Sequence, residues 1–196
     1  MELGLLYSAG KDSSLAALLL DSFYDVTLVT ATFGVTDDWR HAKRTAESAG
    51  FPFERLDLDP EVASEAVDQL QADGFPRNAI QTVHRHALER LANEGFVAIA
   101  DGTRRDDRVP SVSRAQAQSL EDRHEVDYIA PLSGFGRSAV DRLVAAHLDV
   151  ESGPSEEISR ADYEAELQAL LAERAGDEAV SETFPAHEQT YVTGFR

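Results

Sequence analysis

Residues 3–20 read Leu-Gly-Leu-Leu-Tyr-Ser-Ala-Gly-Lys-Asp-Ser-Ser-Leu-Ala-Ala-Leu-Leu-Leu. The apolar run Leu3–Tyr7 predicts a buried parallel strand, because strands covered on both faces are continuously hydrophobic. The small polar residues Ser8–Ser13 then form a tight turn, and the leucines that follow have helical spacing. The first N–H groups of a helix lack internal partners and its dipole favours negative charge. The stretch therefore predicts a phosphate-binding turn between a strand and a helix.

Polar side chains in the turn strengthen this prediction. Lys11 adds a full positive charge, and the hydroxyl groups of Ser8, Ser13 and Ser14 add hydrogen-bond donors. The spacing is neither the Gly-x4-Gly-Lys-[Ser/Thr] of a Walker A loop nor the Gly-x-Gly-x-x-Gly of a dinucleotide-binding turn. A third type of phosphate cradle is indicated.

Length and composition limit the classes of protein and of functional site that the chain could represent. With 196 residues it is long enough for one domain and a small extension. The absence of cysteine excludes disulfides, thiolate nucleophiles and cysteine-held zinc or iron–sulfur centres on this chain. No apolar run is long enough to span a membrane, and the first strand leaves no room for a signal peptide. A cytoplasmic enzyme without a membrane partner is expected.

The net charge of −18 is large for this length, and Lys11 and Lys43 are the only lysines. Abundant Asp and Glu with so little lysine predict a halophilic protein. Acidity ordinarily disfavours a nucleic-acid partner. At 1 M salt the Debye length is only about 3 Å, so the charge neither favours nor excludes RNA.

Apolar and β-branched runs recur between helical patterns along the first three quarters of the chain. Strands are predicted at residues 3–7, 25–33, 53–58, 96–100 and 126–130. Strands that alternate with helices in this way predict an α/β protein with a Rossmann-like, doubly wound parallel sheet of five strands. Ligands of such sheets bind beyond the carboxyl ends of the strands. This rule places Ser8–Ser13, Thr32–Asp38 and Asp101–Arg108 around one crevice.

The C-terminal quarter has a different pattern. Residues 1–150 are predicted to form the nucleotide-binding domain, and 151–196 a helical extension with a tail. The breaker-rich residues 151–159 are predicted to be a linker, with Ser159 capping the helix that follows. The polar tail could cover the crevice as a lid, with His187 as an acid or base, or else be disordered or docked on the surface.

The turn Ser8-Ala9-Gly10-Lys11-Asp12-Ser13 closely resembles the S-G-G-x-D-S signature of the PP-loop ATP pyrophosphatases, which have the adenine nucleotide alpha hydrolase fold. Residue types, the preceding strand and the following helix all match. One departure is Ala9, which stands where the family has glycine. We therefore predict a negative φ at Ala9 and assign any left-handed conformation to Gly10.

The resemblance extends more loosely over residues 1–150. Residues 31–35 resemble the family's second unit, whose backbone holds adenine, and residues 100–108 resemble its motif after the fourth strand. Residues 129–132 are similar to the R-P-L segment of the tRNA-modifying members, with Ala130 where those often have arginine. Among relatives the chain looks most like archaeal PP-loop proteins of unassigned substrate.

The resemblance implies a set of site residues. The nucleotide would be bound by Ser8, Ala9, Gly10, Lys11, Asp12, Ser13, Ser14, Thr32, Phe33, Gly34, Gly102 and Thr103. Catalysis would depend on Lys11, Asp12 and Arg105, and Mg²⁺ would be held by Asp12, Asp106 and Asp107. Two alternatives stay open: Asp106 and Asp107 as solvated surface residues, and Arg105 as an ion-pair partner of neighbouring acids.

The implied reaction is cleavage of ATP to AMP and pyrophosphate with adenylation of a carbonyl oxygen. The substrate would be a tRNA base or a small carbonyl compound, and a second nucleophile would displace AMP. Because the chain lacks cysteine, a thiolation reaction would need sulfide or a sulfur donor protein, and an amination would need an ammonia source. A homodimer is compatible with this reaction. The alternative is a non-catalytic module that binds ATP or AMP on the same scaffold.

Overall fold

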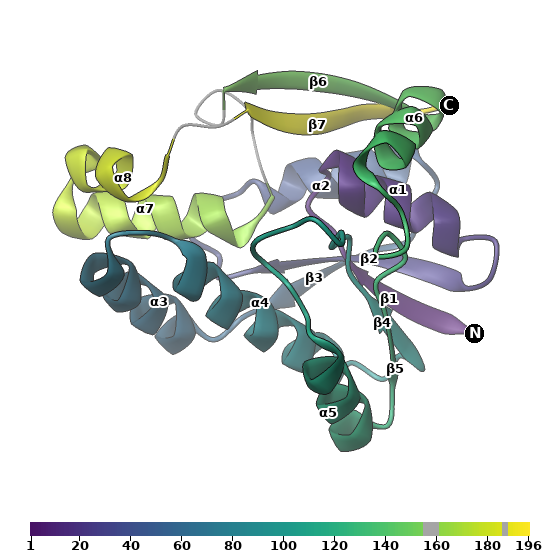
Figure 1. The fold of residues 1–196 in the computed structure, drawn as a ribbon, viewed down its shortest axis with the longest axis horizontal. Coiled ribbons are helices and arrows are strands. Elements are labelled where there is room, and N and C mark those ends of the chain that lie inside the picture. The colour runs from purple at the N-terminus through teal and green to yellow at the C-terminus, as the bar shows by residue number, and fades with distance from the viewer. Residues whose placement is uncertain (155–160, 186–187) are drawn as a thin grey trace.

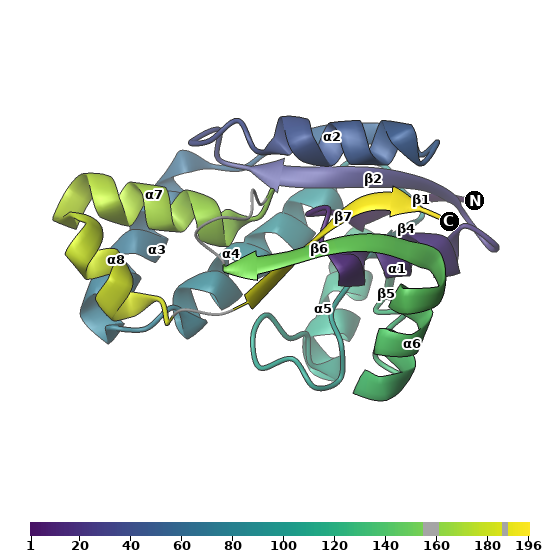
Figure 2. The same ribbon diagram turned by 90° about the horizontal axis from the view of Figure 1, so that it is seen from above.

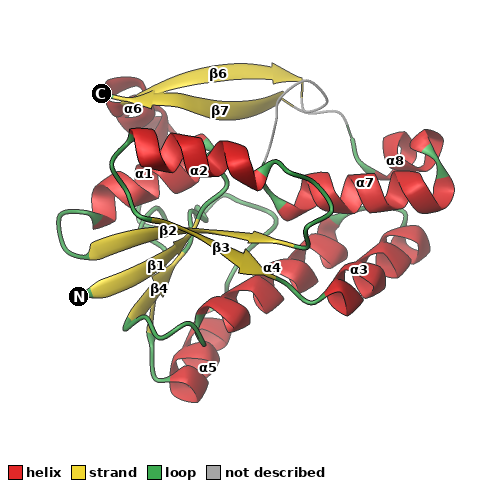
Figure 3. Cartoon of the chain, turned by 180° about the vertical axis from the view of Figure 1, so that it is seen from behind, coloured by secondary structure: helices red, strands yellow, loops and turns green. Residues whose placement is uncertain are grey.

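A parallel sheet forms the centre of the protein, whose computed structural model describes residues 1–154, 161–185 and 188–196 (Figures 1 and 3). In this part of the chain five parallel strands pair in the order β3-β2-β1-β4-β5. The strands are β1 (Glu2–Leu6), β2 (Asp25–Thr32), β3 (Phe53–Asp57), β4 (Ala98–Ala100) and β5 (Asp127–Ile129). The predicted α/β class and doubly wound parallel sheet are confirmed. The strand order reverses between β1 and β4, which places the ligand crevice at their carboxyl ends.

Helices cover both faces of this sheet (Figure 1). One face carries α1 (Lys11–Leu20), α2 (Trp39–Ser48) and α6 (Arg137–His147), and the other carries α3 (Pro60–Asp73), α4 (Arg77–Leu91) and α5 (Arg114–His124). Alternating strand residues supply the two cores: Leu5 and Leu28 pack with α1 and α2, whereas Leu6, Val29 and Ile99 pack with α3 and α4. Burial on both faces explains the continuously apolar strands.

Local signals fix where the helices near the crevice begin. Ser113 and Gln116 form a reciprocal capping box at the start of α5. Helix α4 begins directly after Pro76, and the side-chain amide of Asn78 in its first turn donates to Asp73. Within the described residues, no helix is both long and apolar enough to cross a membrane.

The C-terminal region departs from the predicted linker. Residues 148–154 form β6 (Leu148–Pro154), which pairs antiparallel with β7 (Glu188–Phe195). The linker prediction is wrong for residues 151–154, because pairing with a distant strand stabilises a segment whose composition alone favours a loop; residues 155–159 lie outside the described residues. The helical extension exists as α7 (Tyr163–Ala175) and α8 (Asp177–Thr183). Asp162 caps α7, and Ser159 and His187 lie outside the described residues.

The small β6–β7 sheet lies across α1, on the side away from the parallel sheet (Figures 1 and 2). The N–H group of Val192 donates to the carbonyl oxygen of Ala9 at 3.0 Å. The C-terminal strand is therefore part of the wall around the turn after β1.

Candidate functional site

The turn after β1 presents the start of α1 to the crevice. Gly10 is the N-cap residue and offers no side-chain cap, so the first N–H groups of α1 are left for another acceptor. Hydroxyl groups brace the turn: the Ser8 and Ser13 oxygens lie 3.4 Å apart, and Ser13 donates to the Gly10 carbonyl at 3.2 Å. This arrangement is suited to an anion such as a phosphate.

The backbone prediction for this turn is wrong. Ala9 has φ +60°, in the left-handed region, whereas Gly10 is extended with φ −73° and ψ 160°. The methyl group of Ala9 is buried and its carbonyl oxygen accepts from Val192, so tertiary contacts hold a conformation that alanine disfavours. Such a residue costs on the order of 1–3 kcal/mol. The strain is located in the turn that the sequence assigns to phosphate binding.

Gly102, which follows β4, approaches this turn closely. A Cβ atom at position 102 would lie 2.8 Å from the backbone nitrogen of Ser13 and 2.9 Å from its Cα atom. Because the neighbouring atoms belong to the backbone of α1, they have little freedom to move away. Only glycine therefore lets the loop after β4 meet the start of α1.

Replacing Gly102 with alanine is expected to push these two segments apart. The overpacking should reduce the free energy of unfolding by about 1–3 kcal/mol, and it should also weaken any anion binding by the turn. Chemical denaturation and ATP titration would measure the two effects. Gly134→Ala is the matched control, because nothing lies within 4 Å of a Cβ atom there. Equal effects of both substitutions would contradict the close-approach argument.

A pocket of about 310 Å³ opens beside the turn, at the carboxyl ends of β1 and β4. It is lined by Leu6, Tyr7, Ser8, Asp12, Ser13, Ala31, His84, Asp101, Gly102, Thr103, Asp107, Val109, Pro110, Ala161, Asp162, Tyr163 and Gln189. Residues from the crevice loops thus meet side chains from α4, α7 and β7. Two of the three segments expected at the crevice, Ser8–Ser13 and Asp101–Arg108, contribute to this lining, Thr32–Asp38 does not, and the C-terminal walls were not predicted.

Arg104 lies close to three carboxylates, two of which line this pocket. Its guanidinium lies 3.7 Å from Asp12, 3.5 Å from Asp106 and 3.0 Å from Asp107. Burial lowers the pKa of Arg104, but Asp12 and Asp107 raise this pKa by more, so the net shift is upward. Lys11 pairs with Asp12 at 2.7 Å. The cluster gathers the charged groups that a polyphosphate and its counterion would meet.

The carboxylates fit Mg²⁺ in the way that nucleotide sites usually hold it. No group of three or more metal-ligating side chains exists among the described residues. Magnesium at phosphates typically uses only one or two carboxylates, with phosphate and water oxygens completing the shell. Asp12 and Asp107 line the pocket and supply such oxygens, whereas Asp106 lies outside the lining. These two residues are the candidates.

A buried hydrogen-bond cluster forms the inner wall. His84, 3% exposed, contacts Asp101 Oδ2 through Nε2 at 2.9 Å and the Tyr163 hydroxyl through Nδ1 at 2.5 Å. Asp101 also accepts from Thr103 and from the Tyr128 hydroxyl. Burial raises the pKa of Asp101, but the hydrogen bonds from His84 and Thr103 outweigh this and lower it overall. Burial also raises the pKa of both tyrosines.

A second buried carboxylate holds the end of β2. Glu166, on α7 and 3% exposed, accepts from the Thr32 hydroxyl at 2.7 Å, the Phe33 N–H at 2.9 Å and the Val35 N–H at 3.0 Å. The resemblance assigned this backbone to adenine. In the structure, two of its N–H groups are already bound by a side chain of the C-terminal region.

The structure brings only some of the predicted residues together. Ser8, Asp12, Ser13, Gly102, Thr103 and Asp107 line the pocket. Ser14 is buried, and its hydroxyl donates to the Tyr7 hydroxyl. Thr32, Phe33 and Gly34 lie beside Glu166 outside the pocket lining. Arg105 is exposed and faces Gly136, while the neighbouring Arg104 contacts Asp12.

Comparison with known proteins identifies the family. A family model described as a family of unknown function, DUF7411, matches residues 1–194. The chain belongs to the DUF7411 family. This DUF7411 chain is 41% identical over 197 residues to the uncharacterized protein MJ0690 of Methanocaldococcus jannaschii, covering 100% of this chain and 97% of that protein.

A solved structure from Methanocaldococcus jannaschii supports the fold. It is named as a predicted subunit of tRNA methyltransferase and superposes with a TM-score of 0.90 at 40% identity. The similarity covers 100% of the DUF7411 chain and 98% of the other chain. The whole architecture, including the C-terminal region, is therefore shared with this archaeal protein.

Proposed function

We propose that this DUF7411 protein is an ATP-dependent adenylating enzyme that cleaves ATP to AMP and pyrophosphate. The observation that carries the proposal is the strained turn Ser8–Gly10, which points the uncapped start of α1 into a pocket lined by Asp12 and Asp107. The sequence of this turn resembles that of PP-loop ATP pyrophosphatases. Its position at the strand-order switch agrees with the nucleotide sites of doubly wound sheets.

Each charged group has a role in this proposal. A carbonyl oxygen of the substrate attacks the α-phosphorus, and the bond from that phosphorus to the bridging oxygen breaks. Lys11 and the first N–H groups of α1 stabilise the charge that develops on pyrophosphate. Asp12 and Asp107 would hold Mg²⁺, which neutralises phosphate charge when bound. Arg104 fixes both carboxylates, and the exposed Arg105 is available to the incoming substrate.

The acceptor that we propose is a carbonyl oxygen of a tRNA base. The similar archaeal structure is named as a predicted subunit of tRNA methyltransferase, which supports a role in tRNA modification. A second nucleophile, sulfide or ammonia from a donor, would then displace AMP. A non-catalytic nucleotide-binding module on the same scaffold would bind ATP but release no pyrophosphate.

Lys11→Ala is expected to weaken ATP·Mg²⁺ binding by at least about tenfold, or 1.4 kcal/mol, because it removes the cation of the turn. Isothermal titration of both proteins would measure this. Lys43→Ala, which removes the other lysine from the exposed surface of α2, is the control. Unchanged affinity after the Lys11 substitution would remove the basis for the assigned phosphate site.

Reaction class and substrate require separate measurements. Release of AMP and pyrophosphate, rather than ADP and phosphate, in the presence of tRNA would establish adenylation. Binding without release would favour the non-catalytic module. Comparison of modified nucleosides in total tRNA from wild-type and deletion strains would identify the base, and an unchanged profile would exclude the tRNA branch.

A further inference from the structure

The acidic residues are unevenly distributed along the chain. There are 36 of them among 196 residues, yet residues 74–88, 108–120 and 128–140 contain none. These three stretches belong to α4, to the loop after β4 with α5, and to β5 with the start of α6. The loop packs against α4 through two hydrogen bonds between Gln81 and Ser111, at 2.9 Å and 3.0 Å. These three segments of an otherwise acidic protein therefore carry no carboxylate side chain.

Five exposed arginines lie in or just before these three segments. We call them the arginine rim: Arg85, Arg105, Arg108, Arg114 and Arg137. Unlike Arg104 or Arg123, none of them forms a hydrogen bond or ion pair with any residue in the described ranges. In a chain with twice as many acidic as basic residues, five arginines that lie in or beside acid-free segments and have no partner among the described residues are available to an anion from outside the chain.

The positions of two rim arginines reinforce this point. Arg114 begins α5 and Arg137 begins α6, and neither helix has an acidic residue in its first turn. A positive charge at the positive end of a helix dipole is unfavourable in the free protein. Arg105 lies 3.7 Å from the Cβ position of Gly136, which places it beside Arg137. A bound polyanion would relieve this local repulsion.

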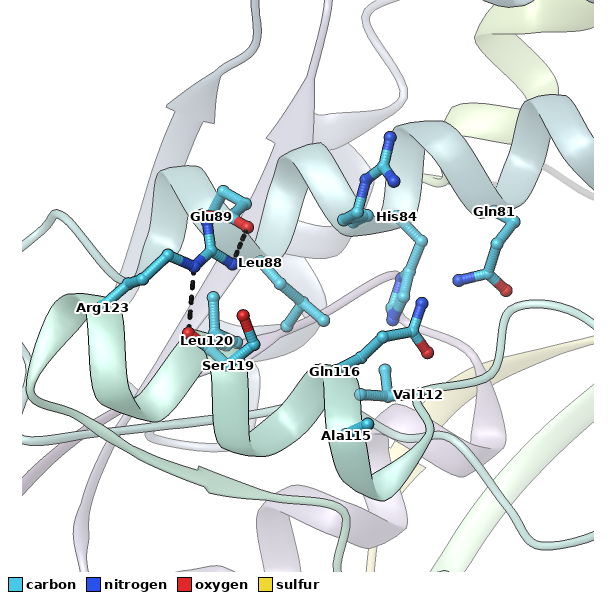
Figure 4. Close-up of a pocket in the computed structure, with 11 residues that line it drawn as sticks. Gln81, His84, Leu88, Glu89, Val112, Ala115, Gln116, Ser119, Leu120 and Arg123 are labelled. Atoms are coloured by element: carbon cyan, nitrogen blue, oxygen red, sulfur yellow. Dashed lines mark hydrogen bonds and ion pairs between the residues drawn. The ribbon is translucent and has the colours of Figure 1, made fainter.

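A groove lies between α4 and α5 (Figure 4), and Arg85 of the rim is among the residues that line it. Its volume is about 290 Å³, and Leu88, Val112 and Leu120 supply its apolar surface. The pair formed by Arg123 and Glu89, at 3.1 Å, crosses one end of the groove, as Figure 4 shows. Along it, the Arg85 guanidinium, the Gln116 amide nitrogen and the Ser119 hydroxyl have no hydrogen-bond partner among the described residues.

We propose that the arginine rim and the α4–α5 groove together bind RNA. The rim contacts phosphates, and the groove receives an unstacked base against its apolar surface, with Gln116 facing the edge of the base. Single-stranded loops of RNA are recognised by this combination of apolar contact and hydrogen bonds to base edges. Charge complementarity favours an anionic partner over a neutral or basic one, and the apolar groove with unpaired polar groups beside the arginines suits the base of an RNA.

The groove lies next to the nucleotide pocket. His84 lines both, and the same loop contributes Pro110 to the pocket and Val112 to the groove. In this proposal two bases of the RNA are bound close together. The base whose carbonyl is adenylated enters the nucleotide pocket, and a nearby base enters the groove on the other side of His84. The choice of tRNA as the RNA rests on the proposed function.

The test is fluorescence anisotropy with labelled, unfractionated tRNA, in the lowest salt at which circular dichroism shows the protein folded. The double variant Arg85→Glu, Arg114→Glu should bind tRNA at least about tenfold more weakly, and the slope of log affinity against log salt should fall by about two. The matched control is Arg90→Glu, Arg142→Glu, which makes the same charge change at exposed, unpaired arginines outside the rim. This control should change the affinity by less than about twofold.

A substitution without a charge change tests the groove itself. Ala115 is exposed and lines the groove, so Ala115→Trp should fill it without disturbing the core. Affinity for tRNA should fall by about fivefold with an unchanged salt slope, because a base contact and no phosphate contact is lost. Equal losses in the rim and control variants, or no loss with the tryptophan, would overturn the assignment.

ATP·Mg²⁺ titration of the same proteins separates the two proposals. Wild-type protein that binds ATP·Mg²⁺ but no tRNA would overturn the RNA surface and leave adenylation of a small carbonyl compound. Rim-dependent tRNA binding without any ATP binding would support the surface and overturn the proposed adenylation.

Discussion

Asp101→Asn is expected to reduce the free energy of unfolding by about 3 kcal/mol, because roughly 1–3 kcal/mol is lost for each buried donor left without an acceptor. Asp101 is 2% exposed and accepts hydrogen bonds from His84, Tyr128 and both the backbone and the hydroxyl of Thr103. An asparagine amide nitrogen cannot accept, so at least one buried donor would lose its partner. Urea denaturation followed by circular dichroism would measure the loss.

The same substitution should change the acid stability. The pKa of Asp101 is lowered in the folded protein, so its ionised form adds stability above its ordinary value of about 3.9. This contribution is lost as the pH falls through the folded-state pKa. In the asparagine variant that part of the pH dependence should disappear.

Tyr128→Phe is the control, because it removes a single donor to Asp101 and should cost only about 1 kcal/mol. An asparagine variant no less stable than this phenylalanine variant would show that the cluster does not hold the inner wall.

Local patterns were sufficient to predict the parallel sheet. Each of the five strands was expected within about two residues of its observed position, because a buried strand between helices leaves a continuous apolar run. The strands β6 and β7 were missed for the opposite reason. These two strands pair with each other across about 40 residues of sequence. Nothing in the composition of either segment indicates that it pairs with the other.

Some residues that line the pocket were predicted from the sequence and others were not. His84 carries a readable signal, since it lies on the apolar stripe of α4 with Ile80, Val83 and Ala87. A polar residue on such a stripe needs a buried partner, and Asp101 directly after β4 was the available one. The sequence could not separate Arg104 from Arg105, because adjacent loop residues differ only in the direction that the folded loop gives them.

The backbone conformation of Ala9 could not be predicted from the sequence for a third reason. Intrinsic preference favours a negative φ for alanine, and the prediction followed that preference. The contact with Val192 that accompanies the left-handed conformation comes from β7, far away in the chain. A residue whose backbone is fixed by a distant strand cannot be predicted from its neighbours.

Glu166→Ala is expected to destabilise the protein by about 3 kcal/mol or more, because each buried donor left without an acceptor costs roughly 1–3 kcal/mol. Thr32, Phe33 and Val35 would all lose their acceptor. Amide hydrogen exchange at Phe33 and Val35 should accelerate, since these N–H groups would no longer be bound. Glu173→Ala, an exposed position on the same helix, should leave both quantities unchanged.

The exchange experiment also tests the assignment of adenine to the end of β2. If this backbone holds adenine, ATP·Mg²⁺ should restore protection of Phe33 and Val35 in the Glu166→Ala protein, because the base would replace the missing carboxylate as a hydrogen-bond partner. In the wild-type protein Glu166 already binds these two N–H groups, so the nucleotide should change their exchange much less. If Phe33 and Val35 still exchange slowly in the Glu166→Ala protein without nucleotide, then hydrogen bonds to Glu166 are not what protects these N–H groups. If exchange in the Glu166→Ala protein stays rapid at saturating ATP·Mg²⁺, adenine binds elsewhere in the pocket. The phosphate site at Lys11 is tested separately, by the titration of the Lys11→Ala protein.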